Sequence, residues 1–316
     1  MKSKWNAAAI PDLKGCTSIV TGASSGVGYE IALQLAAHGA HVILASRNQD
    51  RTSEAARRIE ASAPGASVEV QLLDLADLHS IRRFTNIFSD RHNGLDMLVN
   101  NAGVSGGPHR LTKDGFEAHF QINYLGHFAL TGLLLPTLSL RAGSRVVNMS
   151  SDIASQGRIN FEDLQGQHKY GFVTAYAQSK LANLFFAFEL DRRCRQAGAG
   201  ITSLATNPGV ARSGLLVGKD TDWGRPRSGP ENLLRMAQMV LALPAEKGAL
   251  PALYQATDPS AQSAEYVVGA KWPKRGYPSA GKIPPAALDQ TAARRLWEIS
   301  ENLTGVHYPF LNNKGG

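Results

Sequence analysis

Short apolar runs rich in β-branched residues alternate along the chain with longer stretches of helical period. The short runs predict strands at residues 17–22, 41–46, 68–74, 97–100, 145–149, 201–206 and 266–268. The longer stretches predict helices at residues 26–38, 50–61, 78–92, 114–138, 174–197, 230–243, 244–256 and 285–303. The strand runs are mostly apolar rather than alternating, which is typical of parallel strands buried on both faces. We therefore expect an α/β fold, a doubly wound parallel sheet with helices on both faces.

The strand series is not divided by a linker, an internal repeat or a low-complexity tract. We therefore expect one domain over residues 1–316. Residues 214–229 interrupt the pattern with Gly, Pro, charged residues and one Trp. A long segment of this kind between a strand and a helix is typical of a surface loop, and we interpret it as a lid.

The composition is that of an ordinary globular protein, with 43% hydrophobic and 19% charged residues. This balance excludes a disordered or fibrous chain. Lys and Arg number 33 against 26 Asp and Glu, which gives a net charge of +7. The basic residues are dispersed, so the charge favours anionic ligands and does not indicate nucleic-acid binding.

Candidate metal ligands and membrane segments are few. Cys16 and Cys194 lie far apart, and no CxxC or Cys/His zinc spacing is present. His38 and His41 form an H-x-x-H pair, but across a predicted helix end and strand start, so they cannot share a helical face and no metal is predicted. The longest apolar stretch, 128–140, is shorter than the roughly 20 residues that a membrane-spanning helix needs. We expect a soluble, cytoplasmic protein without a membrane anchor.

Three glycines follow the first predicted strand in the spacing G-x-x-x-G-x-G, at Gly22, Gly26 and Gly28. Glycines allow a tight turn and a close approach of the backbone to a pyrophosphate, which binds at the positive N-terminus of a helix. The same spacing also occurs in plain loops. Its position between a strand and an amphipathic helix favours a dinucleotide site.

The second predicted strand ends in Ser46 and Arg47, where an acidic residue would bind the ribose 2′-hydroxyl of NAD. A guanidinium suits a 2′-phosphate instead, so NADP(H) is favoured, although a strand-end Arg is also common as a solvated surface residue. Asp74, at the end of the third predicted strand, is a candidate acceptor for an adenine amine or a simple turn cap.

Tyr176 and Lys180 lie four residues apart in a predicted helix, which places them on one face. A neighbouring ammonium favours the phenolate, so the tyrosine becomes usable as an acid/base near neutral pH. A serine at a strand end, as in Ser150-Ser151, can orient a substrate carbonyl and donate to the developing oxyanion. By itself, a Tyr–Lys pair at this spacing usually lies on an exposed helix surface. The glycine turn upstream is what favours a catalytic role for this pair.

These residues occur in one order along the chain with three further motifs, namely Asn100-Asn101-Ala102-Gly103, Asn123 and Asn207-Pro208-Gly209. The set resembles the short-chain dehydrogenase/reductase family over nearly the whole chain. The resemblance implies a Rossmann-type sheet of about seven parallel strands. It also implies hydride transfer between NADP(H) and an alcohol/carbonyl pair.

The resemblance assigns four catalytic residues. Tyr176 would be the acid/base, and Lys180 would lower its pKa and hold the nicotinamide ribose. Ser151 would bind the carbonyl oxygen, and Asn123 would position a water. Asn100 would brace the central strand. The implied cofactor contacts are Gly22, Ser24, Ser25, Gly26, Val27, Gly28, Ser46, Arg47, Asp74, Leu75, Asn101, Ala102, Gly103, Tyr176, Lys180, Pro208, Gly209, Val210 and Ser213.

An insert near 157–173 separates Ser151 from Tyr176, and Leu181-Ala182-Asn183-Leu184 follows the lysine. Both features resemble the retinol-dehydrogenase-like branch of the family. Members of that branch act on lipophilic aldehydes, ketones and alcohols, usually with NADP(H). The resemblance therefore implies an NADP-dependent carbonyl reductase or alcohol dehydrogenase. Some members carry a membrane anchor that this chain is not expected to have, so retinal itself is not favoured.

Two other functions stay open: a catalytically silent NADP(H)-binding regulator or scaffold, and a same-fold enzyme that reduces a double bond or epimerises its substrate. A homodimer is also predicted. Phe185, Phe186 and Phe188 cannot all face one side of a helix. The family often pairs this helix across a dimer axis, which favours a subunit contact there.

Overall fold

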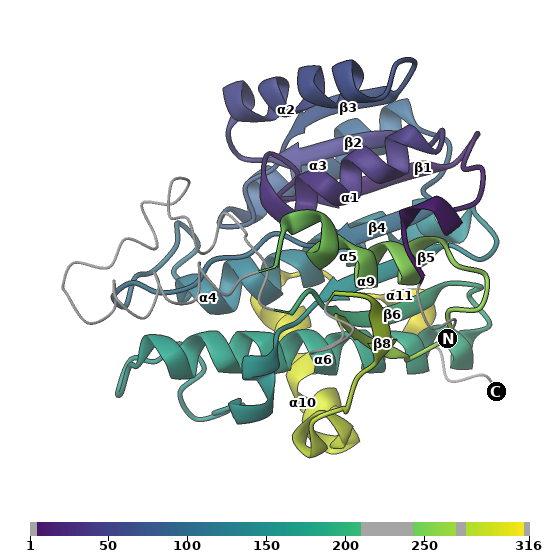
Figure 1. Ribbon diagram of the computed structural model, residues 1–316. Helices are drawn as coiled ribbons and strands as arrows, with labels where there is room; N and C mark the ends of the chain where they lie inside the picture. The colour runs from purple at the N-terminus through teal and green to yellow at the C-terminus, as the bar shows by residue number, and fades with distance from the viewer. Residues whose placement is uncertain (1–4, 210–242, 270–275, 313–316) are drawn as a thin grey trace.

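The computed structural model describes residues 5–209, 243–269 and 276–312. Within these ranges one sheet has the strand order β3-β2-β1-β4-β5-β6-β7-β8 (Figure 1). The strands are β1 (Thr17–Thr21), β2 (His41–Ser46), β3 (Ser67–Leu72), β4 (Met97–Asn100), β5 (Arg145–Met149), β6 (Thr202–Asn207), β7 (Tyr266–Gly269) and β8 (Pro278–Ala280). The α/β fold predicted from the sequence is confirmed.

Strands β1 to β7 are parallel, as predicted, and β8 pairs with β7 in the antiparallel sense. The predicted bounds of the seven parallel strands differ from the observed ones by at most two residues. The eighth strand was not predicted, because three residues beginning with Pro278 carry no apolar run. It becomes a strand only by pairing with the edge of β7.

The helices of the described residues are α1 (Gly26–Ala37), α2 (Gln49–Ser62), α3 (Leu78–Arg91), α4 (Ala118–Phe120), α5 (Gly126–Ser139), α6 (Phe172–Ala197), α9 (Ala245–Thr257), α10 (Gln290–Thr304) and α11 (Pro309–Asn312). One face of the sheet packs against α3, α5, α6 and α10, with Phe84, Phe128 and Trp297 in the core. The other face packs against α1, α2 and α9. None of these helices combines the length and apolar character needed to span a bilayer.

Two predicted helices have different boundaries. The helix predicted at 114–138 begins at Ala118, because the Glu117 side chain accepts a hydrogen bond from the Phe120 amide and caps it there. It then contains a π-helical turn, η2 (Gln121–Leu125), before α5. The segment predicted as one helix at 285–303 is a 3₁₀ turn, η4 (Pro285–Leu288), followed by α10, with Asp289 as the N-cap of the second piece. The predicted lid at 214–229 and all but the last residue of the helix predicted at 230–243 lie outside the described residues.

The aromatic residues of α6 are covered within the chain. Phe185 and Phe186 are buried, and the Phe186 ring stacks on Trp297 of α10 at 5.9 Å between ring centroids. Phe188 packs at the border of the same core. The aromatic spacing that suggested a subunit contact is therefore explained by the C-terminal helix, and the homodimer stays a prediction.

Candidate active site

The carboxyl ends of β1, β4, β5 and β6 meet at one edge of the sheet, because these strands are parallel neighbours. The strand order reverses between β1 and β4, and an open α/β sheet binds its ligands in the crevice at such a point. The glycine turn follows β1 and the N-terminus of α1 closes it. Most of the predicted site residues therefore share one edge.

The three glycine positions of this turn do not accept a side chain without strain or steric overlap. Gly22 and Gly26 have φ angles of +69° and +59°, in the left-handed region that side chains disfavour. A Cβ on Gly28 would lie 2.4 Å from both the Gly22 carbonyl oxygen and the Asn101 Nδ2. Ser24 and Ser25 lie half-buried at the turn, and Val27 is buried below it. The result is a backbone cradle at a helix N-terminus, suited to a phosphate.

Thr21 holds this cradle to β4, although the sequence analysis did not single it out. Its Oγ1 accepts hydrogen bonds from the amides of Asn101 and Ala102, both at 2.9 Å. The Asn101 Nδ2 donates to the Thr21 carbonyl at 2.7 Å. A hydroxyl residue directly before the first glycine was the signal that could have shown this. Asn100 braces the neighbouring strands by donating to Asn148 of β5 at 2.9 Å.

His127 is a second residue that the sequence analysis did not single out. It is buried beside the site. Its Nε2 lies 3.0 Å from the Thr21 Oγ1, and its Nδ1 lies 3.1 Å from the Asn123 carbonyl oxygen. Burial lowers the pKa of His127 to about 4, so the imidazole is neutral near pH 7. It therefore joins the cradle to Asn123 without adding charge.

At the end of β2, a buried serine hydroxyl is followed by an exposed arginine side chain. Ser46 is buried, and its Oγ has no hydrogen-bond partner among the described residues. Arg47 is exposed directly after it. A buried polar atom without a partner is unfavourable, so this position suits a polar ligand group.

Asp74 caps a turn, which is one of the two roles that the sequence analysis considered for it. Its Oδ1 accepts from the Ala76 amide at 2.9 Å. Leu75 is buried beside it, and a Cβ on Gly126 would lie 2.7 Å from the Leu75 carbonyl oxygen. Both residues line the crevice edge where β3 runs into α3.

Lys180 lies inside α6, with 3% of its surface exposed. Its Nζ donates to the Met149 carbonyl at 3.2 Å and lies 5.8 Å from the centroid of the Tyr176 ring. Burial lowers the pKa of the ammonium from 10.5 to about 8. Tyr176 and Lys180 thus share a helix face, as their spacing predicted.

Ser151 and Tyr176 form the hydroxyl pair of the site. A hydrogen bond between their side chains lowers the pKa of Tyr176, but burial raises it by more, so the net shift is upward. The lowering of the Tyr176 pKa by Lys180, which the resemblance implies, stays a prediction. Ser150 is used differently: its Oγ donates to the Lys180 carbonyl at 2.8 Å and supports α6.

Asn123 and Gly103 connect the cradle to the catalytic helix. The Asn123 Oδ1 accepts from the Val104 amide at 2.7 Å, and its Nδ2 donates to Ser179 at 2.9 Å. A Cβ on Gly103 would lie 3.0 Å from the Asn123 Oδ1 and 3.5 Å from the Lys180 Nζ. A side chain here would crowd Asn123, so the small glycine suits the close passage of the chain after β4.

The end of β6 closes the other side of the site. The Asn207 Oδ1 accepts from the Gly209 amide at 2.9 Å, and its Nδ2 donates to Asp152 at 2.8 Å. Gly209, after the half-buried Pro208, has a φ of +70°, so a glycine suits this turn. The predicted contacts Val210 and Ser213 lie outside the described residues.

A buried acid–histidine pair, Glu117 and His119 at the start of α4, lies next to Tyr176 and contacts the insert. His119 Nδ1 lies 2.8 Å from Glu117 Oε1 and 3.3 Å from the Tyr170 hydroxyl of the insert. The His119 ring is 6.1 Å from the Tyr176 ring, and its buried Nε2 has no hydrogen-bond partner among the described residues. The sequence analysis did not single out His119, because only the fold brings the insert against it.

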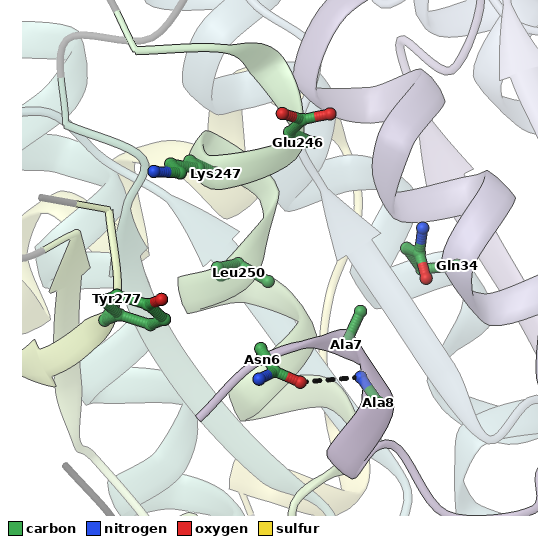
Figure 2. A pocket seen from close by; sticks show the side chains of 8 residues that line it. All are labelled: Asn6, Ala7, Ala8, Gln34, Glu246, Lys247, Leu250 and Tyr277. Atoms are coloured by element: carbon green, nitrogen blue, oxygen red, sulfur yellow. Dashed lines mark hydrogen bonds between the residues drawn. The ribbon is translucent and has the colours of Figure 1, made fainter. Parts of the chain in front are cut away.

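A separate pocket of about 320 Å³ lies between the N-terminal segment, α1 and α9 (Figure 2). The Asn6 side chain accepts a hydrogen bond from the Ala8 amide on one side of the pocket, and Glu246 and Lys247 of α9 also line it. It shares no residue with the predicted cofactor or catalytic sets. It is therefore not the candidate active site.

A family model described as short chain dehydrogenase matches residues 17–222. The chain belongs to the short-chain dehydrogenase/reductase family. Human retinol dehydrogenase 13 is 40% identical over 306 residues, covering 96% of this chain and 88% of its own length. Mouse retinol dehydrogenase 11 is 39% identical, covering 93% of this chain and 88% of its own length. The chain is thus an oxidoreductase of the retinol-dehydrogenase-like branch, as the motifs implied.

Solved structures of this family agree with the fold. An uncharacterized protein from Mycobacterium paratuberculosis is 37% identical, with a TM-score of 0.78, covering 97% of this chain and 99% of its own. A Beutenbergia cavernae protein, described as a candidate NAD(P)-dependent gluconate 5-dehydrogenase and solved with NADP at low occupancy, is 25% identical, with a TM-score of 0.63. It covers 81% of this chain and 96% of its own.

Proposed function

We propose that the protein is an NADP(H)-dependent carbonyl reductase or alcohol dehydrogenase that transfers hydride between a nicotinamide and a lipophilic carbonyl/alcohol pair. The observation that carries this proposal is the arrangement of Ser151, Tyr176 and Lys180 beside the glycine cradle. The chain at Gly103, directly after the cradle residues that follow β4, passes close to the Lys180 Nζ, so one crevice holds both halves of a dehydrogenase site.

The residues present fit NADP(H). The cradle at the N-terminus of α1 suits a pyrophosphate, and the unpartnered Ser46 Oγ with the exposed Arg47 suits a 2′-phosphate. The Beutenbergia cavernae relative, solved with NADP, supports the same cofactor class. When bound, the cofactor would supply or accept the hydride.

Side chains of the protein would transfer the proton and bind the carbonyl oxygen of the substrate. In the reduction direction Tyr176 would donate its hydroxyl proton to the carbonyl oxygen, which Ser151 orients through its own hydroxyl. The Lys180 ammonium would stabilise the phenolate left behind. Because its pKa is about 8, this ammonium is mostly charged at neutral pH. Oxidation of an alcohol uses the same groups in reverse.

A lipophilic substrate is supported by the relatives named retinol dehydrogenase and by the insert. Tyr170 of the insert contacts the buried His119 of α4, whose ring lies beside Tyr176, so the insert reaches the border of the site. A cytoplasmic location and a homodimer remain predictions from the sequence.

The test is fluorescence titration of the purified protein with NADPH and NADH. It is followed by 340 nm absorbance assays over a panel of lipophilic aldehydes and ketones. We expect tighter binding of NADPH and loss of absorbance with at least some members of the panel. Binding without turnover would favour the regulator or the double-bond and epimerase alternatives. Absence of binding would contradict the proposal at its base.

A further inference from the structure

His41, Glu69 and His92 form a compact cluster at the opposite edge of the sheet from the active site. Each offers one ligand atom, and the three atoms all lie within 4.8 Å of one another. His41 opens β2, Glu69 lies in β3, and His92 is the residue directly after α3. The cluster therefore assembles from three elements that are separate in sequence.

The fold places these side chains together for a simple reason. His41 pairs with Ser67 across the β2–β3 ladder, and residues two apart on a strand share a face, so Glu69 lies on that face too. Helix α3 covers the same face, and its C-terminal end delivers His92, whose ring stacks on Phe88. We propose that this cluster is a divalent transition-metal site, best suited to Zn²⁺, with two imidazoles and one carboxylate as ligands.

The distances from Glu69 to the two histidines match a tetrahedral ion. Zinc bound at about 2.0–2.1 Å from each ligand sets neighbouring ligand atoms about 3.4 Å apart. The Glu69 Oε2 lies 3.2 Å from the His92 Nε2 and 3.6 Å from the His41 Nε2. The His92 Nε2 is buried and has no hydrogen bond among the described residues, although it faces the carboxylate. A metal ion between these atoms would satisfy that nitrogen.

The outer groups also support a metal site. The His41 Nδ1 lies 2.7 Å from the Ser67 Oγ, so this nitrogen can carry the proton and leave Nε2 free as a ligand. The Arg91 Nη1 lies 3.2 Å from the Glu69 Oε1 and leaves Oε2 toward the histidines. Arg91 is a repulsive charge for a cation, but it is largely exposed and therefore screened. The His41 and Glu69 side chains are partly accessible, so a water can reach the ion from their side and complete the tetrahedron.

The H-x-x-H pair noted in the sequence does not form this site. The His38 Nδ1 contacts the Gln34 carbonyl at the end of α1, at 2.7 Å. His41 instead finds its partners in β3 and after α3. The sequence prediction of no metal rested on cysteine and histidine spacings along the chain, whereas the cluster depends on strand pairing.

The experiment uses the whole chain without a histidine tag, stripped with a chelator and titrated with Co²⁺ and Zn²⁺ at pH 7.5. We expect one Co²⁺ per chain, with the visible absorption of a tetrahedral ion, its displacement by Zn²⁺, and a Zn²⁺-dependent rise in Tm. His92→Ala and Glu69→Gln should each weaken binding at least about tenfold, whereas His38→Ala, a neighbouring histidine outside the cluster, should not. Circular dichroism checks that each variant folds.

Three results would overturn the proposal. The first is no saturable binding to the folded wild type. The second is binding that is equally strong in His92→Ala and Glu69→Gln, which would mean adventitious surface histidines. The third is an effect of these variants on Tm that is the same with and without Zn²⁺, which would mean that the cluster is only a hydrogen-bonded ion pair. Because Tm and cobalt spectra do not depend on turnover, these results are independent of the proposed function.

Discussion

The glycine cradle and the catalytic cluster lie beside each other but are built on different principles. The cradle, at the ends of β1 and β4, is shaped by backbone conformation and neutral hydrogen bonds, such as those of Thr21 with Asn101 and Ala102. The catalytic cluster consists of Ser151, Tyr176 and Lys180, and burial shifts the pKa of both titratable groups away from their usual values.

The difference shows where each region is vulnerable. The cradle has little room for an added atom, so its function depends on shape. The catalytic cluster holds a lysine whose charge is disfavoured by burial and a tyrosine whose phenolate is disfavoured by the same burial. The charged forms of Lys180 and Tyr176 therefore need a further charge or a substrate in the crevice to stabilise them. Substitutions in the two regions should fail in different measurements.

The largest effect is expected for Tyr176→Phe. Removal of the hydroxyl removes the proton donor, and general acid catalysis typically contributes about 10²–10⁴-fold, so kcat should fall by that range. NADPH affinity should stay within about threefold of the wild type, because the cradle is untouched. The measurement is steady-state turnover at 340 nm together with fluorescence titration. Unchanged kcat would remove Tyr176 from its proposed role.

Gly28→Ala should do the opposite. Its Cβ would meet the Gly22 carbonyl and the Asn101 amide at 2.4 Å, and overpacking of this kind costs about 1–3 kcal/mol. We expect NADPH binding to weaken about 10–100-fold, measured by the same titration. Gly171→Ala is the matched control, because its added Cβ would meet only the Thr174 side chain, at 3.3 Å. Equal losses in both variants would show that the cradle has no special demand for glycine.

Lys180→Met tests whether the folded protein lowers the pKa of Lys180. The folded-state pKa of about 8 lies below the ordinary 10.5, so between these values the unfolded chain binds more protons and the wild type gains stability as pH rises. The methionine variant lacks this gain. Its free energy of unfolding relative to the wild type should fall by up to about 3 kcal/mol from pH 8 to 10.5.

The measurement is urea denaturation of the cofactor-free proteins across that pH range. Lys14→Met, at an exposed position, is the control and should show a flat difference. A flat difference for Lys180→Met as well would show that burial does not shift this lysine.

Arg47→Asp should have the smallest and most selective effect. Loss of the guanidinium at the end of β2 should weaken NADPH about tenfold while NADH binding is unchanged or improved, because a carboxylate suits a free ribose hydroxyl. Arg57→Asp, on the exposed side of α2, is the control. Parallel losses of NADPH and NADH in Arg47→Asp would argue against a 2′-phosphate contact.

The sequence determined the parallel sheet and the order of the motifs along it. Apolar β-branched runs can be recognised locally, and the glycine spacing and the Tyr176–Lys180 interval are local as well. Strand ends were therefore predicted within two residues, and the helix face of α6 was correct. Residues whose role depends on one backbone conformation or one helical turn were within reach of the sequence.

Only the tertiary structure decided which distant side chains meet. His127 joins the cradle to Asn123, and His119 faces Tyr176 from beneath the insert, although both looked like plain helix residues. Likewise His41 and His92 are brought together by strand register and by the end of α3. Burial and pairing between remote segments are properties of the packed fold, because they depend on which surfaces exclude water, and no local pattern in the chain encodes them.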